Sequence, residues 1–309
     1  TSVWQVVPQL YGDLREALKL YYGQYSECPI FLRFRSWVGG DRDGNPNVTA
    51  EVTRTALRFN RETITKLYLN ELRLLWHDLS ISSRFNPVPD ELRKSLAKDA
   101  LTNLLTEHEI RPFVNEPYRI KISYMMARLR WLRDSMSLDA GTEYNSTRFV
   151  RDLELLQRCL KESNMKKLAD TGRLAELLIR ARTFGFHLTG LDIRQHSMIH
   201  EGAVTELLTV GGVCAHYSLL PEEGRLNILG RELQNKQPLL PPKAVVQGEA
   251  RLMLETMELI AQALANNRES IGSYIVSMTA SVSDILEVLL LLKEVGLWHY
   301  DDGVVLDIP

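Results

Sequence analysis

The sequence contains little cysteine and has no surplus of positive charge. Its three cysteines, Cys28, Cys159 and Cys214, are too few and too dispersed for a disulfide framework or a zinc cluster. Such sparse cysteine favours a reducing compartment. Lysine and arginine number 37 against 39 aspartates and glutamates, which gives a net charge of −2. Dedicated nucleic-acid binders normally carry a basic surplus, so this balance argues against that class.

Long hydrophobic runs are also lacking. The longest, Val288 to Leu292, is far shorter than the roughly 20 residues that a membrane-spanning helix requires. The N-terminus has no basic start followed by an apolar stretch, which argues against a signal peptide. It also lacks an initiator methionine, so we expect a processed product, a piece of a longer protein or an incomplete sequence.

The remaining composition is that of an ordinary globular protein. Hydrophobic residues make up 45% and charged residues 25% of the chain, which excludes collagen, a continuous coiled coil and bulk disorder. The length of 309 residues suits one large domain or two of usual size. Because no segment has the character of an interdomain linker, we predict a single region over residues 1–309.

Helical periodicity dominates the sequence. Apolar side chains recur at a helical spacing between residues 51 and 80, and Thr49 is placed to cap that helix with its hydroxyl. Gly296 suits the left-handed position that closes a helix. Further helices are predicted over residues 11–22, 90–105, 118–135, 149–161, 173–183, 203–208, 249–265 and 283–295.

Three short segments are typical of strands instead. Residues 31–37 alternate and are aromatic, residues 186–194 alternate more weakly, and residues 273–278 form a short apolar run. Long helical segments separate them, so neighbouring strands must be parallel and joined by crossovers. The sequence therefore predicts a strongly helix-rich α/β fold. Polar or small residues end each segment, and parallel α/β proteins build their sites at such strand ends.

The densest polar cluster follows the first of these strands. It contains Gly39, Gly40, Asp41, Arg42, Asp43 and Asn45. Glycines permit a close backbone approach or a positive φ, and two acids flanking an arginine can hold it in a bidentate pair. A tight surface turn is the alternative, since the same residue types favour turns. A calcium loop is rejected because its twelfth position is Val52, and a Walker loop because no Gly-Lys-Ser/Thr follows.

A second candidate lies at the end of the second predicted strand. Arg194 can bind a phosphate or carboxylate, because its planar fork of donors matches both groups. The alternative, which the spacing favours, is that Asp192 and Arg194 pair on one strand face. His196 and His200 lie four residues apart, but no third ligand follows at a recognisable spacing. We therefore predict no metal site in this chain.

Residues 34–49, Phe-Arg-Ser-Trp-Val-Gly-Gly-Asp-Arg-Asp-Gly-Asn-Pro-Asn-Val-Thr, resemble a signature block of phosphoenolpyruvate carboxylase. The uninterrupted match from Gly39 to Thr49 makes this resemblance specific. In residues 188–197, which resemble another segment of the family, His196 replaces the usual glutamate. Residues 3–8, 231–241, 274–279 and 283–294 resemble the family as well. The resemblance covers the whole of this chain. The chain in turn corresponds to only a central portion of the enzyme.

The resemblance implies a lyase that joins bicarbonate to phosphoenolpyruvate, giving oxaloacetate and phosphate. This anaplerotic carbon dioxide fixation feeds the tricarboxylic acid cycle. It implies phosphoryl transfer assisted by Mg²⁺ or Mn²⁺, followed by carboxylation of an enolate. It also implies a cytoplasmic homo-oligomer, often a tetramer, with no nucleic-acid or membrane partner. The implied fold is a (β/α)8 TIM-type barrel with many added helices, in which the three predicted strands are consecutive.

The resemblance also implies roles for individual residues. Arg194 would contact the substrate phosphate, and Trp37 would form an apolar wall that keeps water from the enolate. Met278 would lie near the same rim, which the polar cluster at residues 39–45 would order. The family's catalytic His would precede Thr1, and its catalytic Lys and acidic metal ligands would follow Pro309. We therefore expect the isolated chain to be inactive; the alternative is a non-catalytic helical interaction module.

Overall fold

The chain is divided into two compact units. The computed structural model describes residues 2–23, 28–43, 45, 47–134, 144–241, 244–300 and 304–306, the last three by their backbone. Unit 1 comprises residues 1–34 and 60–188, and unit 2 comprises residues 35–59 and 189–309. The single region predicted from the sequence spans both units.

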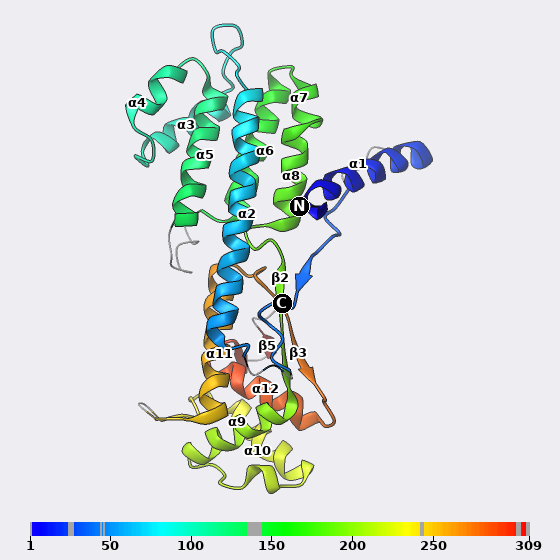
Figure 1. Cartoon of the computed structure of the whole chain (residues 1–309), viewed down its shortest axis with the longest axis vertical. Helices are drawn as coiled ribbons and strands as arrows, with labels where there is room; N and C mark the ends of the chain where they lie inside the picture. Colours follow the sequence, from blue (N-terminus) through cyan, green and yellow to red (C-terminus); the bar gives the residue numbers. More distant parts are fainter. Residues whose placement is uncertain are drawn as a thin grey trace. The chain divides into compact units, whose positions relative to one another are not determined.

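Unit 1 is built of helices around a core rich in aromatic rings. Its elements are α1 (Ser2–Tyr22), α3 (Asp90–Ala100), α4 (Glu107–Ile110), the 3-10 helix η1 (Arg111–Phe113), α5 (Pro117–Asp134), α6 (Ser146–Glu162), α7 (Lys166–Asp170), α8 (Arg173–Phe184) and most of α2 (Ala50–Asp78). Helix α6 packs against α3, α5, α7 and α8, and α1 packs against α8 (Figure 1). Tyr68, Phe149 and Phe186 contact one another at the centre of the core.

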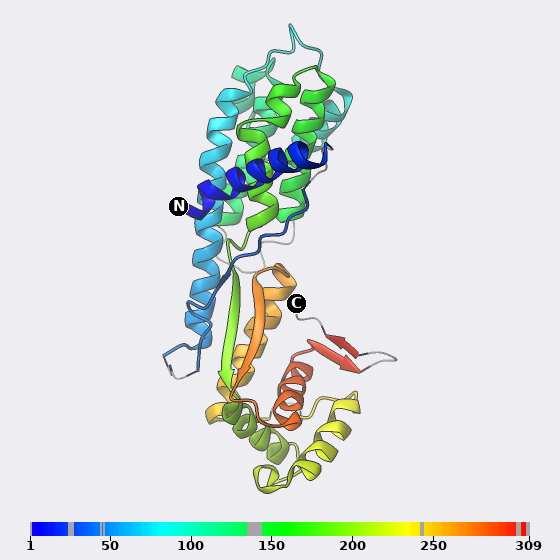
Figure 2. The same cartoon turned by 90° about the vertical axis from the view of Figure 1, so that its right-hand side faces the viewer.

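Unit 2 contains a parallel sheet. Its elements are β1 (Arg35–Ser36), the first turns of α2, β2 (Gly190–His196), α9 (Ser197–Val210), the 3-10 helix η3 (Tyr217–Leu219), α10 (Glu222–Gln234), α11 (Gly248–Asn266), β3 (Ile271–Ser277), α12 (Val282–Glu294), β4 (Trp298–Tyr300) and β5 (Val304–Leu306). The sheet has the order β1-β2-β3 with both pairs parallel, and Figure 2 shows β2 and β3 side by side in one direction. The predicted helix-rich α/β class with three parallel strands is confirmed.

A second hydrophobic core fills unit 2 and orients the central strand. Helix α9 contacts β2, and α11 contacts both α9 and β3. Leu191 and Ile193 of β2 are buried in this core together with Leu207 of α9. Because side chains alternate along a strand, Asp192 and Arg194 face the opposite side of the sheet.

The predicted helices are all present, but α1 begins at Ser2, nine residues before the predicted start, and α3 ends at Ala100, five residues before the predicted end. The Thr49 hydroxyl accepts from the amide of Val52 at 3.4 Å, which confirms the predicted cap of α2. Gly296 has a φ of 75° after α12, which confirms its left-handed conformation. Helix α9 begins at Ser197, earlier than predicted, because the His196 side chain accepts from the amide of Met198 and caps it. Among the described residues, no helix has the length and apolar character that a membrane span needs.

Two of the strands are shorter at their start than the sequence predicts. The predicted strand at residues 31–37 contributes Arg35 and Ser36 alone to the sheet. The amides of Phe31 and Leu32 donate instead to the Tyr11 hydroxyl, at 3.0 and 3.3 Å. The predicted strand at residues 186–194 begins at Gly190, since Leu188 adopts a left-handed φ of 62° that no strand accommodates.

Helix α12 carries a carboxyl group in the core of unit 2. Glu287 is fully buried, and its Oε1 accepts from the Tyr217 hydroxyl at 2.9 Å. Its Oε2 has no hydrogen-bond partner. Burial raises the pKa of Glu287 to about 7; the nearby Glu201 and Asp284 raise it too, while the Tyr217 hydrogen bond and Arg225 oppose the shift.

This raised pKa predicts that stability falls as the pH rises through about 7. Between the ordinary and the raised pKa, the folded chain holds a proton that the unfolded chain releases, so increasing pH favours unfolding. We expect Glu287→Gln to have the wild-type free energy of unfolding near pH 5. At pH 8 it should be more stable than the wild type, by at most about 3 kcal/mol.

Urea unfolding of both proteins at the two pH values measures this difference. Glu258→Gln on α11 is the matched control, because Glu258 is exposed and should leave the pH dependence unchanged. The raised pKa of Glu287 would be contradicted if the stability of the wild type rose steadily from pH 5 to pH 8 and that of Glu287→Gln rose with the same slope.

Candidate functional site

The candidate site lies in unit 2, where the three parallel strands end. The chain passes from β1 into Trp37 and the polar loop, from β2 into α9, and from β3 into Met278. Arg194, near the end of β2, has Ile275 of β3 as its register partner. Parallel neighbours bring their carboxyl ends to one edge, so the topology assigns Trp37, Arg194 and Met278 to the same edge of the sheet.

The polar loop continues the sheet beside β2. The amide of Arg42 donates to the carbonyl of Arg194 at 2.9 Å, and the amide of Arg194 donates to the carbonyl of Gly40 at 2.9 Å. Asp41 thereby forms an isolated parallel bridge with Arg194. Two backbone hydrogen bonds thus fix the loop against the residue whose side chain is the candidate phosphate ligand.

The two loop glycines meet two different requirements. Gly39 has a φ of 86°, a left-handed conformation that residues with a side chain rarely adopt. Gly40 lies so close to β2 that an added Cβ would overlap the carbonyl oxygen of Asp192. The glycine pair therefore serves both purposes that the sequence suggested, a turn and a close backbone approach.

Arg194 forms an ion pair with the loop. Its Nη2 lies 2.8 Å from Oδ2 of Asp43, and its side chain is 35% exposed. Asp192 instead accepts from the amide of Ser273 at 2.9 Å, so the pairing of Asp192 with Arg194 that the spacing favoured is wrong. The sequence did not indicate Asp43 as the partner, because the two residues are far apart in the chain and meet through the loop.

Arg42 anchors the loop to helix α2. Its guanidinium is buried and donates to Oγ1 of Thr53 at 2.6 Å, and that hydroxyl donates to the carbonyl of Gly39 at 2.6 Å. Burial lowers the pKa of Arg42. Within the described part of the chain no carboxylate lies at ion-pair distance from Arg42, so the expected bidentate pair with Asp41 and Asp43 is wrong.

The other polar side chains of the loop act locally. The side-chain oxygen of Asn45 accepts from the amide of Asn47 at 3.1 Å, which closes a short turn. The Oδ1 atom of Asp41 is buried and has no hydrogen-bond partner. Asp41 is thus placed by its backbone bridge to Arg194, while one of its carboxylate oxygens remains unsatisfied.

The two apolar candidates are exposed. Trp37 is 57% exposed and Met278 is 72% exposed. Met278 has a φ of 57°, and its carbonyl accepts from the Ser197 hydroxyl at 3.1 Å, which joins the ends of β2 and β3. Large exposed side chains of this kind suit a surface that a ligand or another segment covers. That Trp37 and Arg194 converge on one substrate stays a prediction.

A buried hydrogen-bonded pair that the sequence did not indicate joins α9 to β3. Nε2 of His200 lies 2.7 Å from the hydroxyl of Tyr274, and His200 is fully buried. Burial lowers the pKa of His200 to about 4, so its ring is neutral at neutral pH. The two residues are 74 positions apart, and no local pattern could have paired them.

A cavity of about 580 Å³ adjoins the loop. Its lining includes Asp43, Asn45, Gln195, Met198 and Leu252. Gln195 and His196 at the end of β2 both line this cavity, whereas Arg194 is not part of the lining. Asp43 both lines this cavity and pairs with Arg194, so the cavity adjoins the candidate phosphate ligand.

These features define a parallel α/β protein that holds a permanent cation at the carboxyl edge of its sheet. Its sequence matches the family described as phosphoenolpyruvate carboxylase over residues 1–306. The chain belongs to the phosphoenolpyruvate carboxylase family.

Curated relatives agree with this assignment. A phosphoenolpyruvate carboxylase of Rhodothermus marinus is 47% identical over 303 residues, covering 97% of this chain and 32% of the relative. That of Roseiflexus castenholzii is 37% identical, covering 97% of this chain and 33% of the relative. The chain thus spans about a third of the length of the curated relatives it matches.

The close approach at Gly40 predicts the effect of a single added methyl group. Gly40→Ala should lower the free energy of unfolding by about 2 kcal/mol or more, because the loop must move away from the Asp192 carbonyl. The matched control is Gly230→Ala in α10, where an added Cβ meets nothing within 4 Å.

The control should be neutral or more stable by up to about 1 kcal/mol, since alanine favours a helix over glycine. Chemical denaturation of the two variants and the wild type measures both effects. Equal stability of Gly40→Ala and the wild type would contradict the described position of the loop against β2.

Proposed function

We propose that this chain forms part of a phosphoenolpyruvate carboxylase that converts bicarbonate and phosphoenolpyruvate into oxaloacetate and phosphate. The family match over residues 1–306 supports the proposal. The observation that carries it is the position of Arg194 at the carboxyl edge of the sheet, held by the loop through two backbone hydrogen bonds. A permanent cation at such an edge suits a substrate that bears a phosphate.

In this proposal, Arg194 neutralises the phosphoryl group while it is transferred. The guanidinium offers five N–H donors, so it can bind two phosphate oxygens at once. The ion pair with Asp43 holds the side chain in place without covering it, since 35% of the Arg194 side chain is exposed. A partly exposed, oriented cation can bind an anion without a large rearrangement.

Trp37 and Met278 would supply the apolar wall of the same pocket. An enolate that meets water is protonated before it can attack carbon dioxide, so exclusion of water protects the carboxylation step. Both side chains are more than half exposed in this chain, which leaves apolar surface for the substrate and for other parts of the enzyme to cover.

The strand order supports a (β/α)8 barrel. Strands that follow each other in the sequence are neighbours in the sheet and run parallel, as in such a barrel. In the described part of the chain, β1 and β3 each pair with β2 alone, so both have an open edge. We propose that further strands of the complete enzyme close the barrel, and that the enzyme is a cytoplasmic homotetramer.

The metal of this reaction, Mg²⁺ or Mn²⁺, would offset negative charge on the substrate when bound. Among the described residues, no three His, Cys, Asp or Glu side chains gather as a metal-binding group. Asp43 is engaged with Arg194, and Asp192 accepts from a backbone amide. These residues do not fit a complete metal site, and we propose that the ligands lie outside this chain.

The proposal predicts a large loss of activity when the cation is removed. In the complete enzyme, Arg194→Gln should lower kcat/KM for phosphoenolpyruvate by about 100-fold or more, because the transferring phosphoryl group loses its positive partner. The matched control is Arg251→Gln, an exposed arginine on α11 that pairs with Glu255. Oxaloacetate formation, coupled to its reduction, measures both variants; a loss below threefold in Arg194→Gln contradicts the role.

The 309-residue chain alone should form no oxaloacetate from bicarbonate and phosphoenolpyruvate, because the catalytic base and metal ligands of the family are expected outside it. The same coupled assay, at high enzyme concentration and with Mg²⁺ or Mn²⁺, tests this. Robust bicarbonate-dependent turnover by the chain would show that it contains a complete catalytic site.

A further inference from the structure

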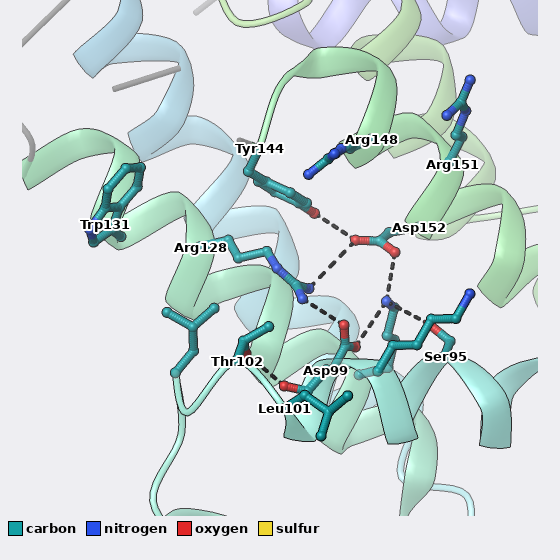
Figure 3. Close-up of a pocket in the computed structure, with 13 residues that line it drawn as sticks. Ser95, Asp99, Leu101, Thr102, Arg128, Trp131, Tyr144, Arg148, Arg151 and Asp152 are labelled. Atoms are coloured by element: carbon teal, nitrogen blue, oxygen red, sulfur yellow. Dashed lines mark hydrogen bonds and ion pairs between the residues drawn. The ribbon is translucent and has the colours of Figure 1, made fainter. Parts of the chain in front are cut away.

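Unit 1 contains a cavity that has no part in the site described above. It lies among α3, α5 and α6, and Figure 3 shows the side chains that line it. Its volume is about 680 Å³, which is within the range of small-molecule sites in proteins. Unit 1 forms its own core, so the cavity can be analysed from the residues of this unit alone.

The floor of the cavity is a buried network of ion pairs. The ammonium group of Lys121 lies 3.0 Å from Asp99, 2.6 Å from Asp152 and 2.9 Å from the Ser95 hydroxyl. The Lys121 side chain is 2% exposed. A buried ammonium is stable there because all three of its donors have acceptors.

A second cation completes the network. Nη2 of Arg128 lies 2.6 Å from Asp99, and Nη1 of the same side chain lies 3.9 Å from Asp152. The Tyr144 hydroxyl donates to Asp152 at 2.8 Å. Figure 3 shows both carboxylates turned toward these donors. The two cations therefore offset the two carboxylates, and the floor of the cavity has no net charge.

Further cations surround this neutral floor. Lys98 of α3 and Arg148 and Arg151 of α6 also line the cavity, so the lining holds five cationic and two acidic side chains. In the described ranges neither Lys98 nor Arg151 has a carboxylate at ion-pair distance. The positive charges of Lys98 and Arg151 are therefore not offset by a paired carboxylate, and a bound anion would offset them.

The cavity also has an apolar part. Trp131 is 47% exposed, and Leu101 is 82% exposed, and both belong to the lining. In Figure 3 Trp131 lies apart from Arg148 and Arg151. This arrangement offers a charged region for an anionic group and an apolar surface for an attached organic group.

We propose that the unit 1 cavity binds a phosphate-bearing small molecule with two or more negative charges. Arginine and lysine side chains suit phosphate, because arginine offers paired donors and lysine a concentrated charge. A diphosphate carries enough negative charge to pair with both Lys98 and Arg151. This site is independent of Arg194, and the proposal stands whether or not the proposed function of unit 2 is correct.

Isothermal titration of the 309-residue chain with two metal-free probes, pyrophosphate and ADP, tests the proposal. We expect saturable binding of at least one probe, weakened by added salt because the attraction is electrostatic. Equal affinities would show that the diphosphate alone is recognised. Tighter binding of ADP would show that the apolar part contributes; both results support the site. No saturable binding of either probe overturns the proposal.

Two double variants test whether the probes bind in the unit 1 cavity. Lys98→Ala with Arg151→Ala should weaken binding at least about tenfold, since hydrogen bonds to charged groups are lost. The matched control is Lys94→Ala with Arg130→Ala, which removes the same charge from exposed positions of α3 and α5 outside the cavity. It should bind as the wild type does.

The replaced side chains are exposed, so both double variants should keep the wild-type circular dichroism and unfolding midpoint. Arg194→Gln separates this site from the strand edge and should leave the affinity unchanged. Two results overturn the proposal: equal weakening in the two double variants, or loss of binding in Arg194→Gln but not in Lys98→Ala with Arg151→Ala.

Discussion

The candidate site depends on one backbone contact, the pairing of the loop after β1 with Arg194 of β2. Two hydrogen bonds, from the Arg42 amide to the Arg194 carbonyl and from the Arg194 amide to the Gly40 carbonyl, hold the loop at the sheet. The absence of a side chain at Gly40 allows this approach. Asp43 reaches the Arg194 guanidinium because the preceding residues are fixed in this way.

The strands and most helices could be predicted because local patterns encode them. Failures arose where a segment is determined by distant contacts. Residues 31–34 alternate like a strand, yet their amides bond the Tyr11 hydroxyl and Phe34 stacks on Phe184. Helix α10 contains Gly224 and Gly230, which weaken the helical signal, and packing against α12 compensates for them. The β4–β5 hairpin was also missed, because strands of three residues are too short for a pattern.

The sequence indicated which residues form the candidate site better than it indicated their contacts. It placed Arg194 and the glycine-rich loop at strand ends, and the topology agrees. The pairing of Arg194 with Asp43, of Arg42 with Thr53, and the unit 1 network around Lys121 join residues far apart in the chain. Periodicity and spacing report local structure, so such long-range pairs required the fold.

The most direct test of this account is a crystal structure of the complete enzyme with phosphoenolpyruvate bound. In that structure the Arg194 guanidinium should lie about 3 Å from phosphate oxygens. The Trp37 indole should pack against the methylene carbon of the ligand. A ligand bound elsewhere, with Arg194 still paired to Asp43 and Trp37 turned away from it, would contradict the account.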